Sequence, residues 1–172
     1  MCSGFPFLTD QSITGTPLKF MSNAKKQVID RFTTEAGYGF LSNFHPSTIY
    51  MDGKSYKTVE HAYQAYKTTD ESNRELIRNA PSPDIAKRLG YALVLRPDWE
   101  QVKIPLMKEF LKKKFENPFL RPLLLQTGDA ELIYTNTWND QCWGVCRGRG
   151  ENWLGKLLME LREELKKSGP ED

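Results

Sequence analysis

Apolar residues recur with a helical period near the C-terminal end of the chain. Leu154, Leu157, Leu158, Leu161 and Leu165 are spaced by three or four positions, so they share one face of a helix. Charged residues such as the Glu163-Glu164 pair fill the positions between them. The pattern predicts an amphipathic helix over residues 152–167 whose leucine stripe packs on a core.

Further helices are predicted in the middle of the chain, where proline, serine, asparagine and aspartate mark helix starts. We expect Gly90 to end one of them as a left-handed residue beyond the last turn. Pro105 lies inside another and should kink or split it. The expected segments are 70–79, from 81–84 to Gly90, from Pro97-Asp98 through Leu111, and from Asn117-Pro118 to near Gly128.

Strands are expected to be few and short. Residues 28–32 and 132–134 have the composition of strands, and Asp52-Gly53 between two short runs (49–51 and 55–57) predicts a hairpin with a tight turn. The fold class predicted is therefore α+β, mainly α: a single-domain helical bundle with a small β hairpin. We expect the domain to cover residues 28–167, with an N-terminal tail or arm (1–27) and a short C-terminal tail (168–172).

A helix is also expected over residues 58–68, with the Thr58 hydroxyl as its N-cap. Counting from Glu60, the residues Tyr63, Gln64 and Lys67 follow at three, four and seven positions and share one face. These side chains provide a carboxylate, a phenol, an amide and an amine. Together they can bind a polar ligand and transfer protons. The alternative is an ordinary solvated face.

Composition narrows the class of protein. The 172 residues are 39% apolar and 12% aromatic, which is enough for a core, and the net charge of +2 does not suggest coating of nucleic acid by charge alone. The run Lys112-Lys113-Lys114 is interpreted as the solvent-exposed side of an amphipathic helix. No apolar run approaches the roughly 20 residues of a membrane span, and no secretory signal is evident.

The cysteine count favours a reduced, intracellular and cytoplasmic chain. Cys2, Cys142 and Cys146 form an odd set, and only His45 and His61 add imidazoles. We therefore expect no metal ion and no cofactor. A Cys-His nucleophilic pair is compatible with the sequence but has no positive support.

The loop of residues 38–44 is a second candidate for chemistry. Its glycines let backbone amides approach a ligand, and Asn43 and Phe44 offer an amide and a stacking ring. The alternative is an ordinary turn with Phe40 and Phe44 buried.

The third candidate is the segment 138–152. Trp138 and Trp143 flank Asp140, and arginines sit among glycines just before the last expected helix. Free amides at a helix N-terminus with guanidinium groups nearby suit a phosphate, and tryptophan faces suit a base. The alternative is an exposed turn. The expected phosphate contacts are Arg147, Arg149 and the amides near Asn152, and Gly144 is a further expected ligand-binding residue.

Several of these runs, in this order, resemble the NADAR family, which is also called YbiA-like. They are Phe40–Phe44, Asp52-Gly53, Thr58–Lys67, Asp140–Gly144 and Asn152–Arg162, and the similarity spans residues 28–165. The resemblance implies a mainly helical fold and an N-glycosidase that cleaves between a ribosyl carbon and an amino nitrogen. Members are associated with removing ADP-ribose from the guanine amino group of nucleic acid. Others are associated with hydrolysing ribosylamino intermediates of riboflavin synthesis.

Under this interpretation Glu60, with Asp140 as second choice, stabilises charge on the anomeric carbon or activates water. Lys67 protonates the departing amine or forms a transient imine with the opened sugar. The sugar and base would contact Asn43, Phe44, Trp138 and Trp143. The expected ligand is ADP-ribose or an ADP-ribosylated guanine nucleotide or nucleic acid, with no membrane and no obligate protein partner. A non-catalytic ADP-ribose or NAD-derivative binding module and a protein-interaction domain are the alternatives outside enzymes.

Overall fold

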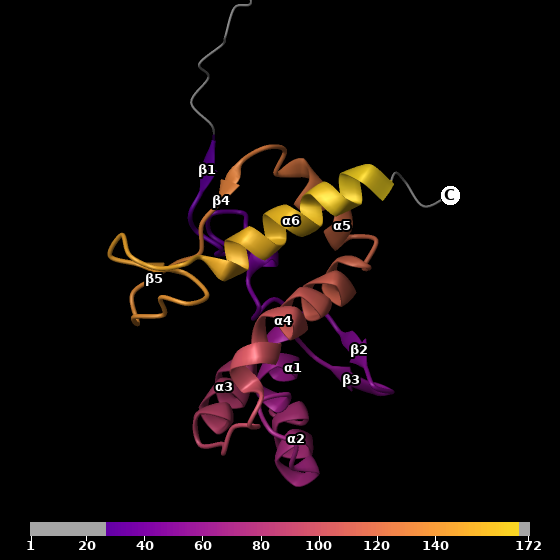
Figure 1. Ribbon diagram of the computed structural model, residues 1–172. Helices are drawn as coiled ribbons and strands as arrows, with labels where there is room; N and C mark the ends of the chain where they lie inside the picture. Colours follow the sequence, from indigo (N-terminus) through magenta and orange to yellow (C-terminus); the bar gives the residue numbers. More distant parts are fainter. Residues whose placement is uncertain (1–26, 169–172) are drawn as a thin grey trace, which may run out of the picture.

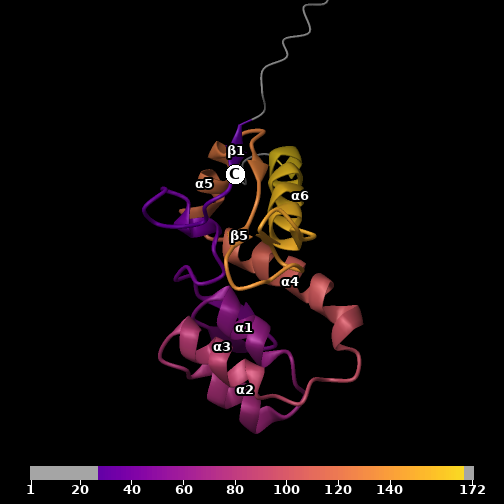
Figure 2. The ribbon, with the colours of Figure 1, turned by 90° about the vertical axis from the view of Figure 1, so that its left-hand side faces the viewer.

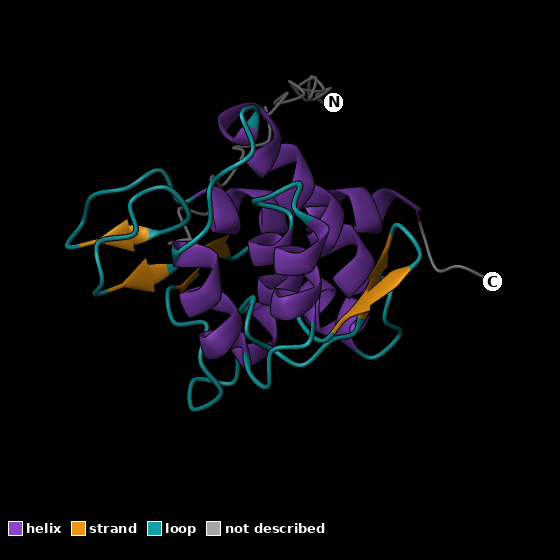
Figure 3. Cartoon of the chain, turned by 90° about the horizontal axis from the view of Figure 1, so that it is seen from below, coloured by secondary structure: helices purple, strands orange, loops and turns teal. Residues whose placement is uncertain are grey.

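The computed structural model describes residues 27–168, so the predicted tails lie outside the described residues apart from Gln27 and Ser168. Figure 3 shows helices in the middle of the molecule and short strands at its edges. Within the described part, α1, α2 and α3 group at one end, α5 and α6 lie at the other, and α4 runs between them (Figure 1). The helices are α1 Val59–Ala65, α2 Glu71–Arg78, α3 Pro83–Tyr91, α4 Trp99–Phe115, α5 Leu120–Gln126 and α6 Trp153–Ser168.

The strands form separate two-stranded pairs. The hairpin pairs β2 with β3 in antiparallel fashion, whereas β1 with β4 and β5 with β6 are parallel. The predicted class, α+β and mainly α, is confirmed, and so is the hairpin. The strands expected near residues 28 and 132 are present but shorter, and β5 and β6 were not predicted. The bounds are β1 Val28–Ile29, β2 Ile49–Met51, β3 Lys54–Tyr56, β4 Glu131–Leu132, β5 Thr135–Asn136 and β6 Val145–Cys146, with a 3-10 turn, η1, at Gly39–Leu41.

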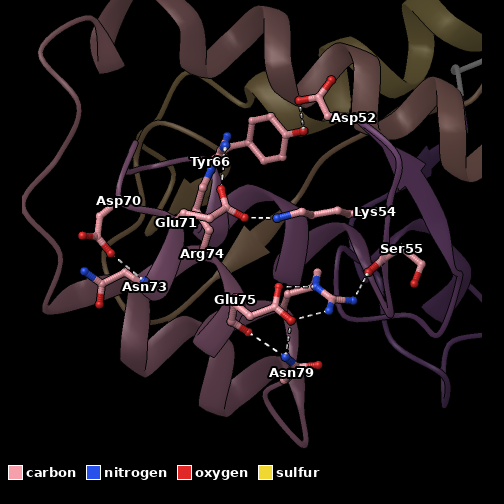
Figure 4. Close-up of polar contacts among 11 residues, drawn as sticks. Asp52, Lys54, Ser55, Tyr66, Asp70, Glu71, Asn73, Arg74, Glu75 and Asn79 are labelled. Carbon is pink, nitrogen blue, oxygen red and sulfur yellow. Dashed lines mark hydrogen bonds and ion pairs between the residues drawn. The ribbon is translucent and has the colours of Figure 1, made fainter.

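The hairpin turn is anchored to the helices beside it. Asp52 and Gly53 have φ angles of 50° and 74°, the left-handed values that a tight hairpin turn requires. The Tyr66 hydroxyl donates to Asp52 Oδ2 at 2.6 Å, and Lys54 pairs with Glu71 at the start of α2 (Figure 4). These contacts fix the hairpin against the end of α1.

Helix α1 lies among several other helices. As predicted, it begins after Thr58, whose hydroxyl accepts from the His61 amide at 3.3 Å. It packs against α2, α3 and α4. The side chains of Glu60 and Gln64 are consequently buried, so the polar row of this helix is not a solvated face.

The prediction that Gly90 ends α3 was wrong. The helix continues through Gly90 to Tyr91. A Cβ atom at Gly90 would lie 1.9 Å from Gln64 Oε1, so the glycine is needed because α1 approaches α3 closely there.

Helix α4 continues through Pro105, so of the two predicted effects of this proline, a kink or a split, the split does not occur. The helix also corrects a prediction about the lysine run. Lys114 is fully buried rather than on the solvent-exposed side of the helix. Its Nζ donates to the Ser42 carbonyl at 2.7 Å. Burial lowers the pKa of this lysine to about 7. The end of α4 therefore holds the loop that follows η1.

The leucine stripe of α6 faces the core as expected. Leu154, Leu157, Leu158 and Leu161 are buried, and Leu165 is partly buried against the same core. The helix packs on α4, α5 and β4. Among the residues described, none of the helices is long and apolar enough to cross a membrane.

Candidate active site

A cavity of about 350 Å3, here called the inner cavity, opens where distant segments of the chain meet. In Figure 2 the loop after β5 descends towards α1 and α4. The walls come from α1, α3 and α4 and from the loops 42–44 and 134–143. The lining residues are Ser42, Asn43, Phe44, Glu60, Tyr63, Gln64, Lys67, Lys87, Tyr91, Trp99, Lys103, Met107, Tyr134, Trp138, Asn139, Asp140, Cys142 and Trp143.

Glu60 is the buried carboxylate of this cavity, with only 6% of its surface exposed. Gln64, one turn later on α1, donates from Nε2 to Glu60 Oε1 at 2.7 Å. Burial raises the pKa of Glu60, and the Gln64 hydrogen bond and the charges of Lys87 and Lys67 partly oppose the rise. A carboxyl group in this setting can exchange a proton closer to neutral pH than an exposed one.

Lys67 lies just beyond the end of α1. Its Nζ is 5.3 Å from the centre of the Tyr63 ring and 5.7 Å from that of Tyr91. Burial lowers the pKa of Lys67, while the negative charges of Glu60 and Asp140 oppose the shift. A larger fraction of the amine is therefore neutral than in an exposed lysine, as a nucleophile requires, and the ammonium form is a stronger acid.

Asp140 supplies the second carboxylate from the loop between β5 and β6. Its Oδ1 accepts from the Trp143 amide at 2.9 Å. Asn136, at the end of β5, donates from Nδ2 to the Asp140 carbonyl at 2.7 Å and accepts from the Asp140 amide at 3.0 Å. The parallel pair of β5 and β6 therefore fixes the position of Asp140 across the cavity from α1.

Aromatic rings form a wall around Tyr63. The Trp143 ring meets the Tyr63 ring edge-on, with centroids 5.3 Å apart, and Trp143 Nε1 donates to the Tyr63 hydroxyl at 3.0 Å. The Trp99 ring also contacts the Tyr63 ring, with centroids 5.2 Å apart. Burial raises the pKa of Tyr63, so its hydroxyl keeps its proton and can donate to a ligand.

The loop after η1 is tied to the carboxylate helix. The Glu60 amide donates to the Asn43 carbonyl at 3.1 Å. Asn43 Nδ2 contacts Met107 Sδ at 3.7 Å, while its buried Oδ1 has no hydrogen-bond partner among the described residues. Because such an acceptor is costly to leave unpaired, a ligand hydroxyl or amine is a suitable partner for it.

Nine of the thirteen residues predicted for the site line the inner cavity. They are Asn43, Phe44, Glu60, Tyr63, Gln64, Lys67, Trp138, Asp140 and Trp143. The other four, Gly144, Arg147, Arg149 and Asn152, lie outside its lining. Both arginines are exposed in the turn after β6.

The start of α6 is not the phosphate cradle that the sequence predicted. The amides of Asn152, Trp153 and Leu154 donate to the carbonyls of Gly144, Cys142 and Trp143. They are therefore not free for an anion.

Asn152 and Gly144 also stabilise the local structure. The Asn152 side chain accepts from the Tyr134 amide and donates to the Leu132 carbonyl, each at 2.9 Å. A Cβ atom on Gly144 would lie 2.2 Å from the Tyr134 carbonyl oxygen. Both residues shape the loop that carries Asp140 and Trp143.

Sequence reasoning missed two cavity lysines, Lys87 on α3 and Lys103 on α4. Lys87 Nζ lies 5.1 Å from the Trp138 ring centre and 5.7 Å from that of Phe44. Nothing in the local sequence distinguishes these lysines from solvated ones. The other lining residues that were missed are Ser42, Tyr91, Trp99, Met107, Tyr134, Asn139 and Cys142.

No cluster of three or more histidine, cysteine, aspartate or glutamate residues suited to a metal is present within residues 27–168. Cys142 and Cys146 are both free thiols, and burial raises the pKa of Cys142. A raised pKa reduces the thiolate fraction, which does not favour Cys142 as a nucleophile.

Comparison with known proteins gives consistent matches. The NADAR domain family matches residues 31–166. N-glycosidase YbiA of Escherichia coli is 46% identical over 142 residues, which cover 80% of this chain and 88% of that protein. An N-glycosidase of Nostoc punctiforme is 41% identical, over 75% of this chain and 86% of the relative.

A riboflavin biosynthesis protein of Vibrio vulnificus is 36% identical over 87% of this chain, which corresponds to 41% of the longer relative. The solved NMR structure of E. coli YbiA superposes with a TM-score of 0.76 at 42% identity. The superposition covers 86% of this chain and 90% of the other.

Proposed function

The chain belongs to the NADAR domain family, and from this membership and its inner cavity we propose that it is an N-glycosidase. The bond cleaved joins C1 of a phosphorylated ribose to an amino nitrogen. One observation carries the proposal: the buried, hydrogen-bonded Glu60 shares an aromatic cavity with Asp140 and Lys67. Relatives named as N-glycosidases support the same reaction class.

Cleavage places positive charge on the anomeric carbon and the ring oxygen. Glu60, when ionised, stabilises that charge and takes a proton from the water that attacks C1. The C1–N bond breaks as the C1–O bond forms, and its electron pair leaves with the nitrogen. Asp140, on the facing loop, adds a second negative charge that favours the transition state.

The departing nitrogen needs a proton. In the simplest route Lys67 donates it as an ammonium group and is re-protonated by solvent. In the alternative route neutral Lys67 attacks C1 of the sugar, the C1–N bond to the departing amine breaks, and that nitrogen takes the proton that the Lys67 nitrogen gives up. The sugar ring then opens as C1 and the Lys67 nitrogen form an imine. Water then hydrolyses the imine and releases the sugar as an aldehyde. The lowered pKa of Lys67 is compatible with both routes.

The proposed substrate is ADP-ribose attached to the amino group of guanine. Lys67, Lys87 and Lys103 give the inner cavity cationic groups that suit phosphates. The rings of Trp99, Trp143 and Tyr63 offer apolar faces that suit a purine.

Incubation with guanine-linked ADP-ribose tests this proposal. Chromatography should detect free ADP-ribose and unmodified guanine in equal amounts. Binding of the substrate without release would instead indicate a non-catalytic reader of ADP-ribose. If the protein neither binds guanine-linked ADP-ribose nor releases ADP-ribose from it, this compound is not the substrate.

A ribosylamino intermediate of riboflavin synthesis is the second candidate. It is favoured by the Vibrio relative, whose name places it in riboflavin biosynthesis. This smaller substrate presents the same phosphorylated ribose bonded to nitrogen. Hydrolysis of the two substrates in parallel under one set of conditions decides between them, because the ratio of their kcat/KM values measures the preference directly.

A further inference from the structure

A second hollow of about 430 Å3, here called the outer groove, adjoins the inner cavity. The two hollows have Ser42, Phe44, Lys87, Tyr134 and Trp138 in common. The groove continues from these shared residues along the segments beside β1 and β5. The residues that line only the groove are Arg31, Phe32, Thr33, Asp84, Thr135, Asn136 and Thr137.

Lys87 marks the boundary between the two hollows. Its ammonium group lies near the faces of two rings, at 5.7 Å from the centre of Phe44 and 5.1 Å from that of Trp138. All three side chains line both hollows. A ligand that spans both hollows can therefore place a phosphate beside the positive charge of Lys87.

Aromatic rings line the outer groove. The Phe32 and Tyr134 rings stack with centroids 5.6 Å apart, and the Trp138 ring meets Tyr134 edge-on at 6.2 Å. Trp138 is 54% exposed, so part of its ring is open to a ligand. Such rings stack on a nucleobase with little sequence preference.

Both hollows are lined by cations and carboxylates. The inner cavity has Lys67, Lys87 and Lys103 beside two carboxylates, Glu60 and Asp140, which repel phosphate locally and attract the developing positive charge of the sugar. The outer groove has Arg31 and the shared Lys87 beside one carboxylate, Asp84. With the sugar at Glu60, the shared Lys87 is therefore the cation to which a diphosphate reaching the outer groove comes first.

We propose that the outer groove is an adenylate subsite. The ribose to be released sits at Glu60, the diphosphate crosses at Lys87, and the adenosine of the same ligand stacks in the outer groove. The proposal rests on the proposed function for its choice of ligand. Each hollow alone is at the small end of the roughly 300–1,000 Å3 typical of ligand sites, so a dinucleotide-sized ligand needs both.

Calorimetric titration of three probes tests the subsite: ADP-ribose, AMP and ribose 5-phosphate. Arg31→Ala removes a cation that lines only the outer groove. It should weaken the binding of ADP-ribose and of AMP by about tenfold, as for loss of a charge-assisted contact. The affinity for ribose 5-phosphate should stay within about twofold. Arg88→Ala, an exposed arginine on α3 outside both linings, is the matched control and should change none of the three.

A second variant fills the groove instead of changing its charge. Thr137 is exposed and lines only the outer groove. Thr137→Trp should also weaken ADP-ribose and AMP selectively. Equal losses for all three probes, or no loss in either variant, would overturn the adenylate subsite.

The catalytic assay separates this inference from the proposed function. Release of ADP-ribose with a KM unchanged by Arg31→Ala and Thr137→Trp would reject the subsite but keep the glycosidase. Arg31-dependent binding of AMP without any release would keep the subsite and reject the glycosidase.

Discussion

Among single residues, Glu60 and Gln64 illustrate how burial and one hydrogen bond act in opposite directions on an acid. Burial raises the pKa of Glu60, whereas the hydrogen bond from Gln64 Nε2 to its carboxylate lowers it. Glu60 acts in its ionised form, so activity is lost as the pH falls through this raised pKa. The acid limb of kcat/KM should therefore lie at a higher pH than for an exposed glutamate.

Gln64→Met tests this assignment, since methionine keeps the volume and removes the donor. Loss of the hydrogen bond should raise the pKa of Glu60 further, and the acid limb should move to higher pH. The measurement is kcat/KM against pH for both proteins. An acid limb that stays in place would mean that Glu60 does not set it.

Lys67 is the residue that decides between the two routes for the leaving group. If an imine forms, borohydride added during turnover should trap a sugar adduct visible by intact-mass analysis, and Lys67→Ala should abolish it. Lys103→Ala is a suitable control because Lys103 also lines the inner cavity. Absence of an adduct in the parent protein would exclude the imine and leave Lys67 as an acid.

The sequence was informative for residues whose neighbours are on the same element. The spacing of Glu60, Tyr63, Gln64 and Lys67 within one helix put them on one face, and all four line the inner cavity. Lys87 could not be found in this way, because its role depends on the packing of α3 against α1. Lys114 was misassigned for the same reason, since its partner Ser42 lies in a distant loop.

At the scale of elements, the contact between α1 and α3 controls the catalytic helix. Gly90→Ala should introduce a methyl group 1.9 Å from Gln64 Oε1 and so displace the side chain that holds Glu60. Overpacking costs about 1–3 kcal/mol and outweighs the roughly 1 kcal/mol that alanine gains in helix propensity. Urea unfolding should show net destabilisation, and turnover should fall by about tenfold or more. Increased stability with unchanged turnover would contradict this view of the contact.

Lys114, near the end of α4, is a titratable residue that holds the loop after η1 by a hydrogen bond. The pKa of Lys114 is about 7 in the folded chain, far below its unfolded value. Between those two values the unfolded chain binds a proton that the folded chain does not. The free energy of unfolding should therefore rise with pH above 7, by up to about 1.4 kcal/mol per unit from this group.

Lys114→Met should remove that part of the slope. Lys113→Met, one position earlier on α4, is the matched control and should keep it. Urea unfolding between pH 7 and 10 measures both. Equal slopes in Lys114→Met and the parent protein would show that Lys114 keeps its proton on folding.

Element boundaries followed the local signals closely where caps and turns set them. Thr58, Asp70 and Ser82 each cap a helix with a side-chain oxygen, and Asp52-Gly53 forms the hairpin turn. β5 and β6 were missed because two-residue strands have no periodicity to detect. Their pairing depends on a loop that returns from Asn136 to Val145.

At the scale of the whole molecule, the inner cavity exists only because five separate segments converge. Sequence patterns identified three of them: the loop 42–44, α1 and the segment around Asp140. They did not show that α3 and α4 would supply lysines and a tryptophan to the same space. They also placed the phosphate contacts at the start of α6, where the backbone amides are already bonded to residues 142–144.

The most direct test of the site is the single-turnover rate of Glu60→Gln with saturating guanine-linked ADP-ribose. Glutamine preserves size and a polar head but can neither accept a proton from water nor carry the negative charge. The rate of ADP-ribose release should fall by about 100- to 10,000-fold. The melting temperature and the affinity for ADP-ribose should stay close to those of the parent protein. A rate near that of the parent protein would contradict the central role given to Glu60.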